Sequence, residues 1–423
     1  MKAILVLALK SAWARRLTLG ITLVAIALAA ALLLAVERVR QDARASFTQS
    51  ISGVDLVLGA RSGSVQLILY AVFHSGSASN NIRWESYQAI AQNPAVAWSV
   101  PLVLGDSHRG FPVIGTSPAY FERVRYADRQ PLAFPAGRSF AGHADAVFEA
   151  VIGSEVARQL GHRVGDRLLI AHGSGELGPE HADKPFVVVG VLAATGTPTD
   201  RSVHVSLQAM TAIHLDWAGG APLPGLQIPA GLVRKFDLQP KEITAALIGL
   251  HNRASVFSLQ RQINAFAGEA LLAVLPGVAL DELWQTLVVV EQILFALCAL
   301  VVLVGLAGLT ATMLASLDQR RRELAILRAL GAGPREIFCM LLIEGLLVTS
   351  LGVLVGCVLL AATIAAAAPL VQAHFGVLLG ARPPSANEIV LLAAILLTGL
   401  VASLVPGWRA WRMSLADGLT PRH

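Results

Sequence analysis

The stretch of sequence that decides the fold reads Asp318-Gln-Arg-Arg-Arg-Glu-Leu-Ala-Ile-Leu-Arg-Ala-Leu-Gly331. It lies between two long apolar runs, Leu287–Leu317 and Ile337–Leu370, which carry one formal charge each, Glu291 and Glu344. A helix that spans a bilayer needs about 20 mostly apolar residues, so both runs are long enough to cross. Short loops rich in arginine stay on the cytoplasmic side. The sequence therefore predicts a short charged helix against the inner face of a membrane, where a cytoplasmic protein can contact it.

The composition is that of a membrane protein with a folded domain outside the bilayer. Hydrophobic residues make up 55% of the 423 residues and charged residues 14%, against about 25% charged in soluble domains. The net charge of +5 does not indicate nucleic-acid binding, because the basic residues cluster beside the apolar runs, where they set topology and contact lipid headgroups. The three cysteines, Cys298, Cys339 and Cys357, lie in or beside those runs. We therefore expect the outer region to fold without disulfides.

Four segments are apolar enough to span a membrane, at about Leu17–Val36, Leu287–Leu314, Phe338–Ala368 and Ile389–Val405. The first could instead be a cleaved signal peptide, but its apolar stretch exceeds the usual core of about 7–15 residues, which favours a signal anchor. Arginine clusters place both termini and the central loop inside. Arg38, Arg40 and Arg44 run against this rule on the outer side, where long translocated domains tolerate them.

The expected organisation follows from these spans. It is a cytoplasmic segment 1–16, a first span 17–36, a periplasmic α/β domain 37–283, a second span 284–317, a cytoplasmic loop 318–333, a third span 334–370, a short periplasmic loop 371–387, a fourth span 388–406 and a cytoplasmic tail 407–423.

The periplasmic region reads as a mixed α/β unit. Ala150–Ile152 predicts a strand that leads into a helix over 153–160, with Ser154 as its N-cap. Pro185–Leu192 predicts a buried strand, and the period-two pattern of Arg201–Leu207 predicts a half-exposed one. A second helix is expected over Ser258–Ala273.

The central loop has the signals of a stiff, capped helix. Leu317, Leu324 and Leu327 sit near helical spacing and give it one apolar edge beside a charged face. Gly331 is a natural helix stop, and Pro334 restarts a helix at its first position. An ordinary loop that only sets topology would not require such a helix.

Residues 319–332 resemble the signature of FtsX-like permeases, the group that includes MacB-type and LolC/LolE-type transporters. The similarity extends to Glu344-Gly345 and to the closing segment 406–419. In the outer region, residues 151–157 and 164–167 resemble the MacB-type periplasmic core. The resemblance thus covers nearly the whole chain.

The resemblance implies the permease subunit of an ABC transporter in the bacterial inner membrane. Its coupling helix would rest in a groove of a cytoplasmic ATPase dimer and pass the motion of that dimer to the periplasmic domain. No Gly-x-x-x-x-Gly-Lys-Ser/Thr motif occurs, so we expect the ATPase to be a separate chain that binds the ATP, and the permease to be non-catalytic and without a cofactor. The expected coupling residues are Arg320, Arg321, Arg322, Glu323, Leu324, Leu327, Arg328 and Gly331.

Other partners and functions follow from the same resemblance. A second copy of the permease, or a homologous permease, should complete a two-fold assembly, together with membrane lipids and a periplasmic or lipoprotein partner. The substrate would be lipid-linked or periplasmic. One alternative is a non-transporting regulator that relays the ATPase state to a periplasmic partner, although the long outer domain favours transport. Another is a zinc-related transport system.

Two acids in the apolar runs have both a functional and a structural interpretation, and four glycines there are candidates for helix packing. An acid inside a span costs roughly 2.5–3.5 kcal/mol and marks function by default, whereas near the membrane surface Glu291 and Glu344 would cost less and play a structural role. Small residues let helix backbones approach. The candidates for such packing, within one subunit rather than between two, are Gly305, Gly308, Gly352 and Gly356.

The histidines give only a diffuse signal. His172, His181, His204 and His214 fall in one stretch of the outer domain with several aspartates, and imidazole with carboxylate suits zinc. No pair has helical His-x-x-x-His spacing, so the sequence predicts no metal site, and the candidate ligands to follow are His204, His214 and Asp216. No Gly-x-Ser-x-Gly or His-Glu-x-x-His motif supports an enzyme.

Overall fold

The computed structural model describes residues 16–50, 52–76, 78–141, 146–173, 178–218, 221–223, 225, 227–319, 321–329, 331–375 and 382–412. These residues form two compact units, which we describe separately. One is a helical bundle built from the described residues 16–42, from Val288–Pro369 and from residues 382–412. The other is an α/β domain formed mainly by Ala43–Leu287.

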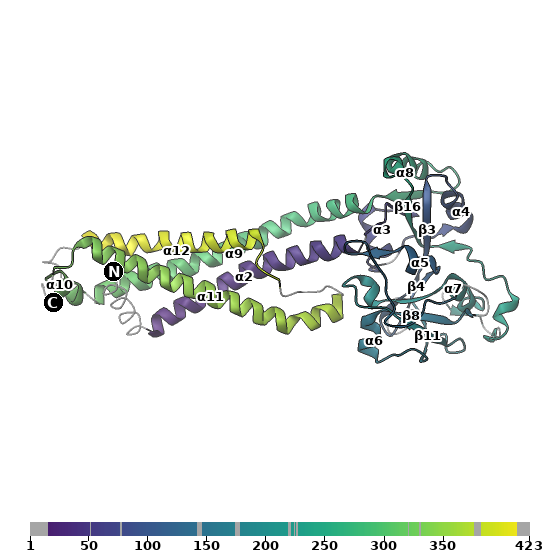
Figure 1. Ribbon diagram of the computed structural model, residues 1–423, viewed down its shortest axis with the longest axis horizontal. Helices are drawn as coiled ribbons and strands as arrows, with labels where there is room; N and C mark the ends of the chain where they lie inside the picture. The colour runs from purple at the N-terminus through teal and green to yellow at the C-terminus, as the bar shows by residue number, and fades with distance from the viewer. Residues whose placement is uncertain are drawn as a thin grey trace. The chain divides into compact units, whose positions relative to one another are not determined.

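Four helices in the described chain are long and apolar enough to cross a membrane. They are α2 (Arg16–Gln49), α9 (Pro276–Gln319), α11 (Pro334–Phe375) and α12 (Ala386–Arg412), and the short α10 (Arg321–Ala329) connects α9 to α11 (Figure 1). The predicted four-helix membrane architecture is confirmed. Several helices run past the apolar segments, as α2 does beyond Val36, and the span limits themselves stay predictions because helix ends do not mark a membrane surface.

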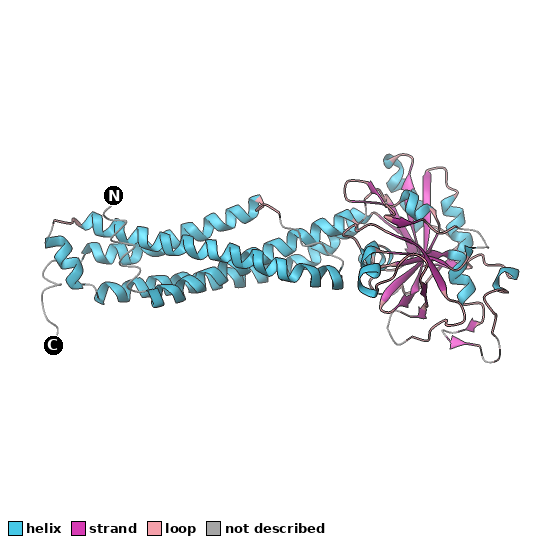
Figure 2. Cartoon of the chain, turned by 60° about the horizontal axis from the view of Figure 1, so that its bottom comes forward, coloured by secondary structure: helices cyan, strands magenta, loops and turns pink. Residues whose placement is uncertain are grey.

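The α/β domain is organised by one mixed sheet, drawn in magenta in Figure 2. Its described strands are β1 (Leu56–Ala60), β3 (Val96–His108), β4 (Phe111–Thr116), β7 (Ala136–Gly137), β8 (Glu149–Ile152), β9 (Arg167–Leu168), β10 (Ala171–His172), β11 (Phe186–Val191), β12 (Val203–Ser206), β16 (Ala245–Leu250) and β17 (Leu271–Val274). Three ribbons lie outside it, formed by β2 (Ile82–Arg83) with β15 (Glu242–Ile243), β5 (Arg125–Tyr126) with β6 (Gln130–Pro131), and β13 (Trp217–Ala218) with β14 (Ala221–Pro222).

Short helices accompany the sheet. They are α3 (Ser64–Ala71), α4 (Trp84–Ala91), α5 (Ala119–Arg123), α6 (Ser154–Leu160), α7 (Leu207–Ile213) and α8 (Val256–Asn264), with 3-10 turns η2 (Pro198–Arg201), η3 (Val233–Lys235) and η4 (Arg253–Ser255). The strand order is β17-β1-β16-β3-β4-β12-β8-β11-β7, with β10 on β3 and β9 on β11. The pairs β4–β12 and β8–β11 are parallel. The predicted mixed α/β class is therefore confirmed.

The long strand β3 joins the two halves of this sheet. Its first part pairs with β16 and its second part with β4. The register with β4 shifts between Leu104 and Asp106, and the residue between them, Gly105, has φ +143. A bulge of this kind bends a strand and redirects the side chain next to it. Here that side chain is Asp106.

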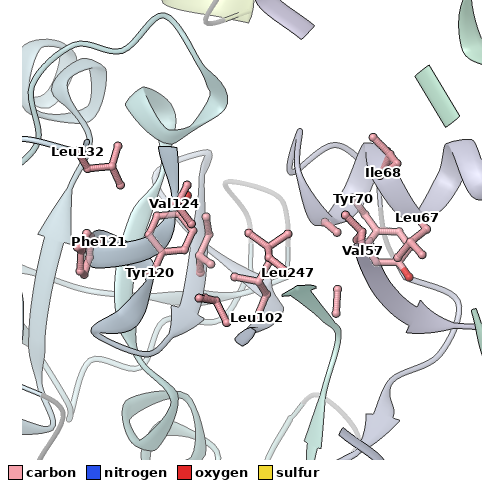
Figure 3. Packing of buried hydrophobic residues seen from close by; sticks show 14 of the residues in the cluster. Val57, Leu67, Ile68, Tyr70, Leu102, Tyr120, Phe121, Val124, Leu132 and Leu247 are labelled. Atoms are coloured by element: carbon pink, nitrogen blue, oxygen red, sulfur yellow. The ribbon is translucent and has the colours of Figure 1, made fainter. Parts of the chain in front are cut away.

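Large apolar side chains fill the space between the sheet and its helices (Figure 3). Leu67, Ile68 and Tyr70 of α3 lie on one part of this cluster, and Tyr120 and Phe121 of α5 on another. Each such buried side chain stabilises the fold by about 1.5–3 kcal/mol. The cluster therefore fixes the helices on the sheet.

Three local predictions were wrong. All four residues of β12 are buried, because the strand lies inside the sheet between β4 and β8 with apolar side chains on both faces. Gly153, not Ser154, is the N-cap of α6, because Gly153 has an extended backbone (φ −69, ψ 159) and Ser154 is already the first helical residue. Helix α8 ends at Asn264, and the residues from Leu271 join the sheet as β17, beside β1.

Candidate functional site

The short helix α10 is held on the bundle by its inner face. Leu324 is buried in a cluster that includes Met313 of α9 and Ile337 of α11. One turn further along, the Arg328 guanidinium donates a hydrogen bond to the Ala410 carbonyl at 3.0 Å. The partial negative charge at the C-terminus of α12 favours a cation there. Thus α10 contacts three of the long helices through one face.

The opposite face of α10 carries an apolar residue that we did not predict as a coupling residue. Ile326 is 61% exposed, two positions from Leu324 and therefore about 200° around the helix. Gly331 follows α10 with φ +99, as expected of a helix stop, and α11 begins at Pro334. The position of Arg320, and the side chains of Arg321, Arg322, Glu323 and Leu327, lie outside the described part of the chain.

A buried network of charges lies at the other end of the bundle. Glu37 of α2 accepts hydrogen bonds from the Arg40 guanidinium at 2.9 and 3.0 Å, from the Asn387 amide at 3.1 Å and from Gln41. Arg40 also lies 3.7 Å from Glu291 of α9. The predicted intramembrane acid Glu291 is thus part of an ion-pair network. Its partner, Arg40, is one of the arginines that run against the positive-inside rule.

Arg382 ties the segment before α12 to α2. Its guanidinium lies 3.2 Å from Asp42 and 3.8 Å from Glu388, and it donates a hydrogen bond to Gln41 at 3.0 Å. Arg38 in turn donates to the Arg382 carbonyl at 2.9 Å. Opposite charges paired in this way reduce the free-energy cost of burying each of them.

A cavity of about 400 Å³ opens beside this network. Its walls are mostly apolar and come from α2, α11 and α12, with Leu34, Leu360 and Leu392 among them. Its polar lining consists of Arg38, Arg382 and Glu388, together with Cys357. The size is in the range of small-molecule pockets. The arrangement suits a ligand with an apolar body and a polar end.

The four glycines predicted to pack helices differ in how closely another helix approaches them. A Cβ at Gly352 would lie 2.8 Å from Ile26, and one at Gly356 would lie 2.7 Å from the Ala27 carbonyl, so both allow α11 to approach α2. Gly305 also faces α2, at an ordinary 3.8 Å, and nothing described lies within 4 Å of a Cβ at Gly308. The partner of the Gly-x-x-x-Gly pattern is therefore α2, within one chain. Glu344 is buried in the bundle.

The three candidate metal ligands are not neighbours. His204 is buried in the domain core, with its ring centroid 4.9 Å from that of Tyr120. Asp216 accepts hydrogen bonds from the buried Lys184 ammonium at 2.8 and 2.9 Å. His214 alone lies beside other histidines, with His172 Nδ1 at 3.1 Å from its Nε2 and the His181 ring 5.1 Å away.

Because His204 is buried, we expect the protein to lose stability in acid. Burial lowers the pKa of His204 from 6.5 to about 3. Between these two pH values the unfolded chain binds a proton at this histidine that the folded chain does not bind. The free energy of unfolding therefore falls as the pH falls. For one such group, each unit by which the pH falls lowers the free energy of unfolding by about 1.4 kcal/mol. Between about pH 7 and pH 5, thermal unfolding should show a loss of about 2 kcal/mol that His204→Leu removes.

The exposed His251 provides the matched control, because His251→Leu removes an imidazole from the surface and leaves the buried His204 in place. His74, whose pKa burial lowers to about 4, contributes in the same direction and stays in both variants. An equal loss on acidification in wild type and His204→Leu would contradict the prediction.

Comparison with known proteins supports the family resemblance of both parts of the chain. Residues 19–263, more than half of the chain, match the MacB-like periplasmic core domain, and residues 295–415 match the FtsX-like permease C-terminal domain. The macrolide export ATP-binding/permease protein MacB of Nitrobacter winogradskyi is 27% identical over 238 residues, which cover 56% of this chain and 34% of that protein. The chain thus spans about a third of the length of this relative.

A second relative is matched over most of its length. The lipoprotein-releasing system transmembrane protein LolC of Xylella fastidiosa is 20% identical over 79% of this chain and 81% of its own. Among solved structures, the periplasmic region of MacB from Actinobacillus actinomycetemcomitans aligns with 57% of this chain and 97% of that chain, at 12% identity and a TM-score of 0.32.

Proposed function

Because this chain belongs to the FtsX-like permeases that carry a MacB-like periplasmic core domain, we propose that it couples a cytoplasmic ATPase to motion of its periplasmic domain. In this proposal it is the non-catalytic membrane subunit of an ABC transporter in a bacterial inner membrane. The ATP is bound by a partner chain. Transport then proceeds by mechanotransmission, in which movement of the helices, rather than a central channel, moves the substrate.

The observation that carries this proposal is the attachment of α10. A nine-residue helix is joined by its chain to α9 and α11 and by Arg328 to the end of α12, and in our proposal these attachments pass its displacement to the long helices. Its exposed Ile326 offers an apolar side chain to a groove on a partner. In our proposal the cytoplasmic ATPase binds α10 and displaces it.

The bundle cavity supports a substrate with a lipid part. Its apolar walls suit an acyl chain, and the paired charges of Arg38, Arg382 and Glu388 at its polar end suit a polar headgroup. We therefore propose a lipid-linked substrate, with a periplasmic solute as the second class. An ATPase that closes as a dimer has two coupling grooves, so we also propose that two permease copies, or one copy and a homologue, share it.

Purification of the intact complex from its native membrane tests this function. We expect a cytoplasmic ATP-binding protein to co-purify, and its ATP hydrolysis in nanodiscs to depend on the permease. A lipoprotein or a lipid-bearing substrate in the same preparation would support transport. A cell-wall hydrolase in its place would favour the regulator, and the absence of any ATP-binding protein from an intact preparation would overturn the proposal.

A further inference from the structure

Four side chains of the α/β domain converge on one small volume. They are Asp106 of β3, His172 of β10, His181 in the loop before β11, and His214 at the end of α7. Each offers one ligand atom, and these four atoms all lie within 4.8 Å of one another. Asp106 and His181 are buried, at 4% and 1% exposure. Such a set of donors from four places in the sequence needs an explanation.

The fold brings these residues together by strand pairing and helix capping. His172 lies directly opposite Asp106 where β10 pairs with β3, and the bulge at Gly105 sets the direction of the Asp106 side chain. The hydroxyl of Ser206 accepts a hydrogen bond from the Ala209 amide at 3.0 Å and starts α7, which delivers His214 at its C-cap.

Three distances within the cluster are close to those of a tetrahedral metal site. His172 Nδ1 lies 3.1 Å from Asp106 Oδ1 and 3.1 Å from His214 Nε2, and His214 Nε2 lies 3.7 Å from Asp106 Oδ2. Ligand atoms about 2.0–2.1 Å from a tetrahedral Zn²⁺ are ~3.3 Å apart. These three separations scatter around this value, and the ligand atom of His181 lies within 4.8 Å of the other three.

The orientation of the rings also suits a metal. His214 Nδ1 donates to the Met210 carbonyl at 2.8 Å, which leaves the lone pair of Nε2 directed at the cluster. Metal-binding histidines commonly make this second hydrogen bond to a backbone carbonyl. Within the described residues, neither ring nitrogen of His181 has a hydrogen-bond partner. A buried imidazole with both nitrogens unpaired is costly unless a ligand completes it.

A hydrogen-bonded cluster without a metal explains less. A single proton on His172 Nδ1 can satisfy Asp106 or His214, and it leaves both ring nitrogens of His181 without a hydrogen-bond partner among the described residues. Within the described residues, no well-aligned hydrogen bond reaches either carboxylate oxygen of Asp106. The neighbouring cation Lys184 is already paired with Asp216 and Asp183. Among the described residues, the ion-pair partners of Asp106 are therefore the cluster histidines His172 and His214, which are cations only when protonated.

We propose that Asp106, His172, His181 and His214 form a four-ligand binding site for a divalent transition-metal ion, with Zn²⁺ as the ion that this donor set favours. Three imidazoles with one carboxylate suit zinc and its neighbours rather than Mg²⁺ or Ca²⁺, which take oxygen ligands. Four protein ligands complete a tetrahedron and leave no open position for a substrate water. The site therefore holds a metal rather than using it for hydrolysis.

This inference does not depend on the proposed coupling to an ATPase, because all four ligands belong to the α/β domain. Bound metal would join β3, β10, α7 and the segment that carries His181. We therefore expect it to stabilise the folded chain in proportion to the free metal concentration.

The test uses the full-length protein in nanodiscs, purified through a tag without histidine and treated with a chelator. Elemental analysis after addition of Zn²⁺ should give one tightly bound ion per chain, and its affinity can be measured against a chromophoric chelator. His172→Ala and His214→Ala should each weaken binding by at least about 100-fold, more than the loss of an outer-shell partner usually costs. His251→Ala, at an exposed position, should bind like wild type.

X-ray absorption of the zinc-loaded wild type keeps the proposal testable even if a variant fails to fold. We expect a first shell of nitrogen and oxygen only, with the scattering pattern of imidazole rings. Sulfur in the shell would place the ion on the cysteines of the bundle and overturn the site. So would an affinity that is unchanged in folded His172→Ala and His214→Ala, or the absence of a stoichiometric ion in wild type.

Discussion

Replacing Ile326 by glutamate is expected to abolish coupling to the ATPase while leaving the fold of the permease intact. The side chain is 61% exposed, and substitutions at such positions usually change stability within about ±0.5 kcal/mol. A carboxylate pushed into an apolar groove of a partner costs far more, and an interface hot spot contributes about 2 kcal/mol or more. We therefore expect at least about a tenfold loss of ATPase binding, measured by co-purification and by hydrolysis in nanodiscs.

The same helix provides the matched contrast. Leu324→Glu places the charge on the buried face of α10 and should lower the thermal unfolding midpoint as well as coupling. Arg321→Glu combined with Arg322→Glu tests the charged residues of the resemblance, because like charges at an interface cost several kcal/mol. Normal coupling in Ile326→Glu and in the double reversal would mean that the loop only sets topology.

A second large effect is expected in the charge network of the bundle. Glu37→Leu removes the carboxylate that binds Arg40, Gln41 and Asn387 and leaves the Arg40 guanidinium with the more distant acid Glu291, at 3.7 Å. Breaking a buried ion pair by removing one partner usually costs about 3–5 kcal/mol. The thermal unfolding midpoint of the nanodisc-embedded protein should fall accordingly.

The double variant Glu37→Leu with Arg40→Leu separates loss of charge pairing from loss of packing. A buried pair can often be replaced by apolar residues at little cost, so the double variant should recover much of the stability that Glu37→Leu loses. If Glu37→Leu unfolds at the wild-type midpoint, the network does not stabilise the bundle.

The bundle could be predicted from the sequence because its signals are local. Long apolar runs and arginine clusters are properties of neighbouring residues, and Gly331 and Pro334 mark helix ends by their own backbone preferences. Ile326 shows the limit of this reasoning. The charged residues around it predict a charged outer face. Leu324 is buried, and Ile326 lies about 200° around the helix from it, so Ile326 is an apolar residue on that outer face.

The histidine cluster could not be predicted, because strand pairing and helix ends create it. His172 and Asp106 are neighbours only through the register of β10 on β3. The sequence shows His172, His181, His204 and His214 in one stretch with several aspartates, and its candidate ligands were His204, His214 and Asp216. Yet β12 buries His204 in the core, and Asp216 binds Lys184. Separation along the chain does not predict which side chains meet, because strand pairing brings the ligands together.

The hydrogen bond from Arg328 to the last turn of α12 limits how the length of this chain can vary in evolution. Removing one residue from α10 would rotate all that follows by about 100°. Arg328 would then leave the end of α12, and Ile326 would turn from its exposed position. Insertions and deletions should therefore be rare between Gln319 and Gly331 in related sequences, even where the residues themselves differ.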